Sequence, residues 1–411
     1  MFTESDAEQV FQVNPENAKG LNTAGNIENW VEGVRGVISD SIVRFKCYCM
    51  AAAILLKPLD AQSFIVDHFG ETSTGKSFGF VVAVSMYGNP KELIFSGDST
   101  SSFVEEKLAK STDLSLFLDE TTTQDPEIRK KIIYMFANEV GKGRANKEGG
   151  IRNVNRWKAV GFTTGEKPII DYDWFGGLQV RAIEINREMP SMPDQIRKAE
   201  DAINENHGHV IGRLLWKVIN QKDELKVKYN SYRKYFTSSN LNTENRMGNT
   251  FAVIALAGEL LEEVFAEIGI EPQDNLELTM DFFNETVKDK PVESSEYKAL
   301  KFLEDWFEEN RNNFVNTEYP GRKPFKICGY LQDHYIDIIP TVLNDALKSH
   351  GFDPSSIKEK WISLDVQKIN NCRNGRKDFK ATYKDENGET LRPHVCRIDL
   401  EKMQEMLDKR N

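Results

Sequence analysis

The pattern of apolar and polar positions changes character along the chain and predicts its organisation. Between residues 26 and 56 apolar residues recur at helical spacing and predict two helices. Between residues 64 and 185 short apolar runs alternate with helical patterns, which is typical of buried strands in a parallel α/β sheet. We therefore predict a helical N-terminal segment (1–58), an α/β core (59–190), a helical region (191–290) and a C-terminal domain (291–411).

One segment interrupts the core pattern where a buried strand passes into a helix. The apolar run 64–69 ends at the sequence GETSTGKS, and the helical pattern resumes at Phe78. This sequence fits G-x-x-x-x-G-K-[ST], a phosphate-binding loop whose glycines let successive backbone N–H groups point at a nucleotide. Lys76 would reach the β- and γ-phosphates, and the Ser77 hydroxyl would hold Mg²⁺. The predicted nucleotide site consists of Gly70, Glu71, Thr72, Ser73, Thr74, Gly75, Lys76 and Ser77.

A second predicted strand ends in acidic residues. Residues 114–118 are mostly apolar, and Asp119 and Glu120 follow them. Ligands of open α/β sheets bind at the carboxyl ends of the strands, so these carboxylates should lie beside the phosphate loop. We predict that Asp119 orients a Mg²⁺-bound water and that Glu120 is the general base for the attacking water. An exposed acidic turn after a strand is the competing interpretation.

Three further residues are candidates for sensing or completing the nucleotide site. The strand at 159–162 ends in two threonines, and the Thr164 hydroxyl could bind the water or the γ-phosphate, although a Thr-rich turn has the same sequence. Arg181 is our preferred candidate for an arginine finger supplied to a neighbouring subunit, with Arg144 as the second. Arg246 begins a strongly apolar helix and is a candidate second sensor or a solvated arginine.

Residues 141–158 depart from the acidic character of the chain, whose formal net charge is −11. This stretch holds six basic residues and one acidic residue, and the turn at 146–150 separates two extended arms. We predict a basic β-hairpin between the acidic strand end and the next core strand. It could grip a phosphate backbone, and a solvated hairpin without a partner is the alternative.

These motifs resemble the AAA+ ATPase module of helicases carried by mobile elements and phages, which are related to superfamily-three and MCM-like helicases. The most similar family is named only as a domain of unknown function and includes the self-loading helicases of staphylococcal cassette chromosomes. The first two of the matching stretches are generic to phosphate-loop ATPases, and the others point to this family. Within residues 70–215 the stretches are GETSTGKS, LFLDET, GKGRANKEGG, FTTGEKP, GLQVRAIEI and ENHGHVIGRLL.

The resemblance implies an α/β P-loop NTPase of the AAA+ class, with residues 191–290 as a helical lid. It implies a bacterial, cytoplasmic homo-hexamer that hydrolyses ATP with Mg²⁺ and moves along single-stranded DNA, and a primase or polymerase is a candidate partner. The implied DNA contacts are Lys142, Arg144, Lys147 and Arg152. The alternative is a AAA+ ATPase that remodels or loads a protein client in replication or transposition. A small-molecule kinase is weaker, because no acceptor pocket is evident.

The C-terminal domain has a different pattern from the core. A helix at 295–310 precedes short strands and further helices, which fits a winged-helix-like α+β domain. Its candidate phosphate contacts are Lys368, Arg373, Arg376, Lys377 and Lys380. A protein–protein or autoinhibitory role is equally compatible with this sequence.

The composition limits the class of protein and its partners. With 411 residues, 39% hydrophobic and 28% charged, the chain can form more than one globular domain. No apolar run is long enough to span a membrane, and the N-terminus is acidic rather than signal-like, so no membrane partner is expected. The five cysteines form no C-x-x-C pair, which favours a reduced, cytosolic protein without a zinc site.

Overall fold

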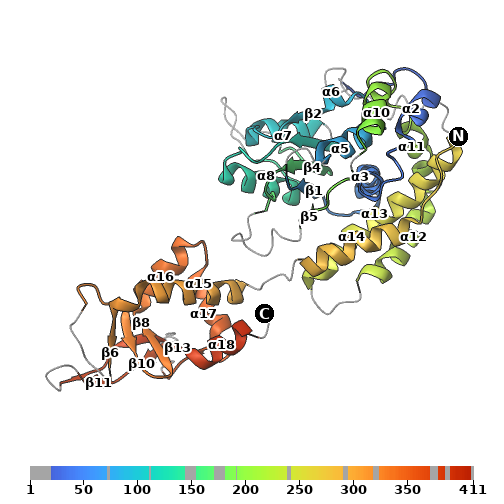
Figure 1. Cartoon of the computed structure of the whole chain (residues 1–411). Coiled ribbons are helices and arrows are strands. Elements are labelled where there is room, and N and C mark those ends of the chain that lie inside the picture. The colour runs from blue at the N-terminus through green and yellow to red at the C-terminus, as the bar shows by residue number, and fades with distance from the viewer. Residues whose placement is uncertain are drawn as a thin grey trace, which may run out of the picture. The chain divides into compact units, whose positions relative to one another are not determined.

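The computed structural model forms two compact units, which are described separately below (Figure 1). The first unit holds the predicted N-terminal segment, core and helical region, and the second holds the predicted C-terminal domain. The structure describes residues 20–71, 75–110, 113–143, 154–170, 181–190, 192–237, 242–289, 295–317, 324–370, 378–384 and 389–408.

A five-stranded parallel sheet forms the centre of the first unit, in the order β2-β3-β4-β1-β5. The strands are β1 (Phe64–Phe69), β2 (Ile94–Ser96), β3 (Ser115–Asp119), β4 (Val160–Gly165) and β5 (Ala182–Ile185). Because the pairing is parallel throughout, the carboxyl ends of these strands open onto one edge of the sheet. The sheet and its helices confirm the predicted α/β core of the P-loop kind.

Helices cover both faces of this sheet. On one face, the Phe80 ring of α5 lies 5.0 Å from Phe117 and 4.8 Å from Phe162 between ring centroids. On the other face, a Cβ atom at Gly161 would lie 2.8 Å from the Phe136 ring of α8, so glycine lets α8 approach. The helices around the sheet are α5 (Lys76–Ser85), α6 (Pro90–Leu93), α7 (Ser101–Lys110) and α8 (Pro126–Asn138).

The remaining helices of the first unit pack around α3, which is buried along nearly its whole length. The helix contacts both α5 and α13, and its Phe45 ring stacks on Phe282 of α14 with centroids 4.0 Å apart. The N-terminal helices are α2 (Ile27–Val34), α3 (Ser41–Ala52) and α4 (Leu56–Leu59). The later helices are α10 (Pro193–Glu205), α11 (Ile211–Asn220), α12 (Lys222–Phe236), α13 (Asn242–Glu267) and α14 (Asn275–Asp289). None of the helices that the structure describes is both long and apolar enough to cross a membrane.

The second unit packs helices on a small, mostly antiparallel sheet, in the order β10-β13-β8-β7-β6 with β9 beside β13. Its core gathers Leu300, Leu303, Ile336 and Trp361. The helices are α15 (Ser295–Asn310), α16 (Pro340–Ser349), α17 (Pro354–Ser363) and α18 (Leu400–Asp408). The strands are β6 (Phe314–Asn316), β7 (Gly329–Leu331), β8 (Tyr335–Ile338), β9 (Gln367–Lys368), β10 (Phe379–Lys380), β11 (Tyr383–Lys384), β12 (Thr390–Leu391) and β13 (His394–Asp399).

Candidate nucleotide site

The predicted phosphate loop lies between the carboxyl end of β1 and the start of α5. Gly70 and Gly75 have φ angles of 139° and 78°, which side chains rarely adopt. A Cβ atom at Gly75 would also lie 3.1 Å from the sulfur of Met189, so a side chain there would have to displace Met189 by a few tenths of an ångström. Lys76 opens α5, and its amine donates hydrogen bonds to the carbonyls of Gly70 (2.6 Å) and Glu71. Thr72, Ser73 and Thr74 lie outside the described residues.

The two predicted magnesium ligands are in contact with each other. The Ser77 hydroxyl donates to Oδ1 of Asp119 over 2.7 Å, and the Thr164 hydroxyl donates to the same oxygen over 2.6 Å. A carboxylate beside a hydroxyl fits Mg²⁺, which usually takes few protein ligands and completes its shell with nucleotide phosphates and water. In the part of the chain that the structure describes, no group of three or more His, Cys, Asp or Glu residues is arranged to hold a metal ion.

Glu120 lies beside this cluster in an uncommon backbone conformation. Its φ angle is 61°, in the left-handed region, and such residues often occur at functional sites. Its backbone N–H donates to the Thr164 hydroxyl over 3.0 Å, and its carboxylate accepts from the Thr122 N–H over 3.2 Å. Thr164 therefore links the two carboxylate residues at the end of β3 through one hydroxyl group.

Sequence analysis missed two residues that hold the ends of β3 and β4 together. The Thr121 N–H donates to the Thr164 carbonyl over 2.7 Å. The Thr122 hydroxyl accepts from the Glu166 N–H over 2.7 Å. The three consecutive threonines after Glu120 were the available signal, because hydroxyl side chains often form such local bonds at strand ends.

Arg181 lies away from this edge, and Arg246 lies on α13, close enough for its charge to act on Arg181. Arg181 precedes β5, and its carbonyl accepts from the Ile65 N–H, which places it at the amino end of the sheet. Its guanidinium lies 5.4 Å from the Tyr134 ring centroid. Burial lowers the pKa of Arg181, and the positive charge of Arg246 lowers it further.

The described part of the predicted basic hairpin consists of the two ends of the segment. Val140 and Arg156 form an antiparallel bridge, and the Gly141 N–H donates to the Asn155 carbonyl over 2.9 Å. Lys142 follows this bridge and is exposed. The other predicted DNA contacts, Arg144, Lys147 and Arg152, lie outside the described residues.

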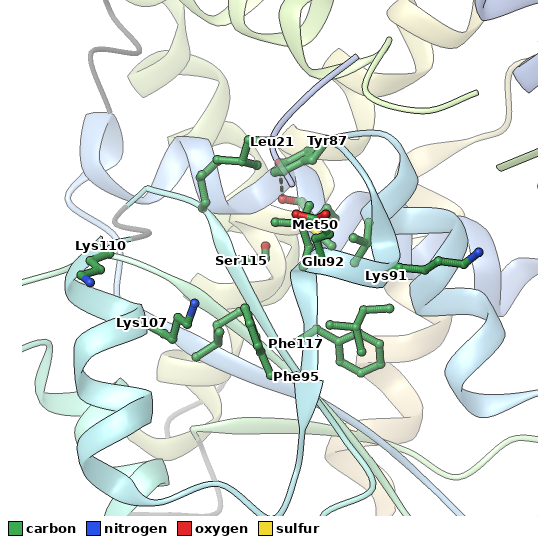
Figure 2. A pocket seen from close by; sticks show the side chains of 15 residues that line it. Leu21, Met50, Tyr87, Lys91, Glu92, Phe95, Lys107, Lys110, Ser115 and Phe117 are labelled. Carbon is green, nitrogen blue, oxygen red and sulfur yellow. Dashed lines mark hydrogen bonds between the residues drawn. The ribbon is translucent and has the colours of Figure 1, made fainter. Parts of the chain in front are cut away.

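Two cavities lie at opposite ends of the strands. An open cavity of about 600 Å³ adjoins Gly70 and Glu71 at the phosphate loop. A second cavity of about 370 Å³ is lined by Phe95, Phe117 and Ser115 (Figure 2). Ser115 is the first residue of β3 and Asp119 the last, so this second cavity is at the far end of the strand from the carboxylates and is not part of the nucleotide site.

The fold and the loop together define a P-loop-like α/β core, and two family profiles match parts of the chain. Residues 1–156 match the profile described as Domain of unknown function (DUF927), and residues 294–401 match the Cch helix turn helix domain. The chain thus carries both domains, which confirms the predicted resemblance to the family of staphylococcal cassette chromosome helicases.

One solved structure supports the same fold. It is described as "SCCmec type IV Cch - active helicase" and is similar to this chain with a TM-score of 0.70 and 21% sequence identity. The similarity covers 94% of this chain and 72% of that one. A comparison with curated proteins found no match.

Proposed function

We propose that this chain is an ATP-dependent DNA helicase or translocase of a mobile genetic element, with an AAA+ core, a helical lid formed by α10–α14 and a winged-helix-like C-terminal domain. The observation that carries the proposal is the contact of Ser77 and Thr164 with Asp119, beside Glu120 and the phosphate loop. A bare glycine-rich loop would need none of these partners. The helicase described above supports the fold of this proposal.

In the proposed reaction the loop binds the phosphates, and the Lys76 amine exchanges its two loop carbonyls for phosphate oxygens. The magnesium ion supplies charge neutralisation on the phosphates when bound, and Ser77 and Asp119 would hold it. Thr164 orients Asp119 and the backbone of Glu120. The Glu120 carboxylate accepts a proton from the attacking water.

The sheet geometry supports an arginine finger in trans. Arg181 precedes Ala182, which pairs with Ile65, so Arg181 is level with Phe64. With a rise of about 3.3 Å per residue, about 20 Å of strand separates that level from Gly70. An arginine side chain cannot span this distance, so Arg181 would serve the site of a neighbouring copy, as in a homo-hexameric ring.

Single-stranded DNA is the proposed track, and the basic segment from Lys142 to Arg152 is the proposed grip. Two of the five candidate phosphate contacts of the C-terminal unit are among the described residues. Lys368 pairs with Asp365 at 2.8 Å and with Asp399 at 3.3 Å, whereas Lys380 is exposed. Arg373, Arg376 and Lys377 lie outside the described residues. A primase or polymerase partner and a cytoplasmic, bacterial setting remain parts of the proposal.

The test is the ATPase rate with and without single-stranded DNA, from low to high salt. Stimulation that fades steeply with salt is expected, because phosphate binding releases counterions. Replacing Lys142 and Lys147 by Gln should abolish the stimulation, while the same change at two exposed lysines of α12, Lys222 and Lys226, should not. A rate indifferent to DNA at every salt concentration would overturn the motor proposal and favour the alternative, a protein client.

A mixing experiment tests the shared active site. Lys76→Ala and Arg181→Ala should each abolish hydrolysis alone. Mixed together, they should regain part of the activity, because the Lys76→Ala copy supplies Arg181 to the intact loop of the other copy. No recovery, together with co-assembly of the two variants, would contradict the trans arrangement.

A further inference from the structure

A buried lysine contacts the phosphate loop from inside the protein. Lys46 of α3 is fully buried. Its amine donates to the carbonyl of Lys76 over 2.8 Å and contacts Nδ1 of His68 over 2.6 Å. The amine also lies 4.1 Å from the centroid of the Phe80 ring. Within the described chain no carboxylate is at ion-pair distance from it, and burial lowers the pKa of the amine well below its ordinary value, although more distant carboxylates oppose this shift.

Arg44, two residues earlier on the same helix, has a different set of partners. Arg44 is also fully buried, but two of its nitrogens bind the carboxylate of Glu262 over 2.6 and 2.5 Å. The fold therefore supplies a counter-ion to one buried cation of α3 and only neutral acceptors to the other. A lysine that served packing alone could be replaced by an apolar residue at lower cost.

The partner of Lys46 connects the loop to the last helix of the unit. Nε2 of His68 lies 2.7 Å from the Arg187 carbonyl, to which it must donate, so Nδ1 accepts from Lys46. Burial, aided by the charge of Lys46, lowers the pKa of His68 to about 3, which keeps the ring neutral. The guanidinium of Arg187 then pairs with Asp281 at 2.8 Å and with Glu285 at 2.5 Å, both on α14.

A glycine in α5 leaves room for this arrangement. A Cβ atom at Gly79 would lie 3.0 Å from both Cδ and Nζ of Lys46. Alanine at this position would favour the helix but would displace the end of the lysine side chain by a few tenths of an ångström.

We propose that Lys46 and His68 are positioning residues of the phosphate loop. They fix the first turn of α5 at the Lys76 carbonyl relative to the segment that follows β5, and so couple nucleotide binding to the position of α14. Neither residue reaches the nucleotide. The inference rests on the proposed function and adds to it a route between the loop and the helical lid.

The first test measures binding of the fluorescent nucleotide mant-ADP, and kcat and KM for ATP, in the full chain. Lys46→Met should weaken mant-ADP binding about tenfold, since the amine's hydrogen bonds to the Lys76 carbonyl and to His68 are both lost. His68→Leu should do the same, and His68→Gln, which keeps a donor and an acceptor, should recover most of the affinity. Cys47→Ala, a buried change on the same helix, should leave affinity unaltered.

Gly79→Ala tests the same contact without removing the lysine. Helix propensity predicts equal or higher thermal stability, whereas the displaced amine predicts weaker binding of mant-ADP. If Lys46→Met fails to fold, Gly79→Ala still tests whether the position of the Lys46 amine affects nucleotide affinity. Affinity equal to that of the unmodified protein in the folded variants would overturn the inference. Failure of the unmodified protein to bind mant-ADP would overturn the proposed function instead.

The coupling to α14 is tested with a double-mutant cycle on mant-ADP affinity. The first change is Lys46→Met, and the second combines Asp281→Asn with Glu285→Gln, which releases Arg187 from α14. If the loop and α14 are coupled, the fold-loss of mant-ADP affinity in the combined variant should be clearly smaller than the product of the two separate fold-losses. A combined loss equal to that product would overturn the proposed route to the lid.

Discussion

Replacing Thr164 by valine separates the proposed catalytic role of its hydroxyl from its role in stability. The chain offers a matched control one residue earlier on β4, because Thr163 and Thr164 are both 1% exposed. The Thr163 hydroxyl donates to Asp67 over 2.6 Å, just as the Thr164 hydroxyl donates to Asp119 over 2.6 Å. Successive residues of a strand point to opposite faces, so only Thr164 faces the nucleotide site.

The expected loss of stability is similar in the two variants. Valine has the shape of threonine, so packing is kept and the change removes hydrogen bonds. A bond to a carboxylate contributes about 1.5–3 kcal/mol and one to a neutral N–H about 1 kcal/mol. Thr164 has one of each, and water can partly replace the first because Asp119 is half-exposed. We expect each variant to lose about 2–3 kcal/mol, which leaves a typical domain folded.

The assay combines urea unfolding with steady-state ATP hydrolysis. Thr164→Val should lower kcat by about 100-fold, because the carboxylates proposed to hold Mg²⁺ and to activate water lose their shared support. Thr163→Val should keep kcat within about twofold at a similar urea midpoint. Equal losses of kcat in both variants, or hydrolysis by Thr164→Val at the unmodified rate, would refute the assignment of this hydroxyl.

Glu120→Gln should bind mant-ATP normally and lower single-turnover hydrolysis by at least about 100-fold. Glu262→Gln, which weakens the buried pair with Arg44, should lower the free energy of unfolding by about 3 kcal/mol in urea titrations. His68 has a pKa of about 3 in the folded state and about 6.5 unfolded, so stability should fall by about 1.4 kcal/mol per pH unit below 6.5, and His68→Gln should reduce this slope.

The phosphate loop and the acidic strand end could be predicted from sequence because their chemistry fixes residue types at adjacent positions. Residues 70–77 and 119–120 are such stretches, and the structure brings the described ones together with Thr164. Met189 packs on Gly75, but no sequence motif marks this methionine as part of the loop's surroundings. Its role depends on the return of the chain past the loop after β5, and no local pattern encodes that return.

The buried cations of α3 show a different limit of sequence reading. In an amphipathic helix, polar residues mark the solvent face, so Arg44 and Lys46 in the pattern of residues 41–52 look exposed. The structure buries both completely, because α3 is covered by the sheet-facing helix α5 on one side and by α13 on another. Only the partners, Glu262 far along the chain and His68 on β1, distinguish a buried cation from a solvated one.

The position of α3 also determines which part of the chain should work as a nucleotide-binding unit. Arg44 and Lys46 are two residues apart on α3. Arg44 contacts α13, and Lys46 contacts the first turn of α5. The segment before residue 59 is therefore part of the support of the loop as well as of the hydrophobic core. A fragment that begins at residue 59 would keep the whole G-x-x-x-x-G-K-[ST] motif and lose the amine behind it. If Lys46 supports the loop as proposed, a fragment should need α3 to bind nucleotide normally.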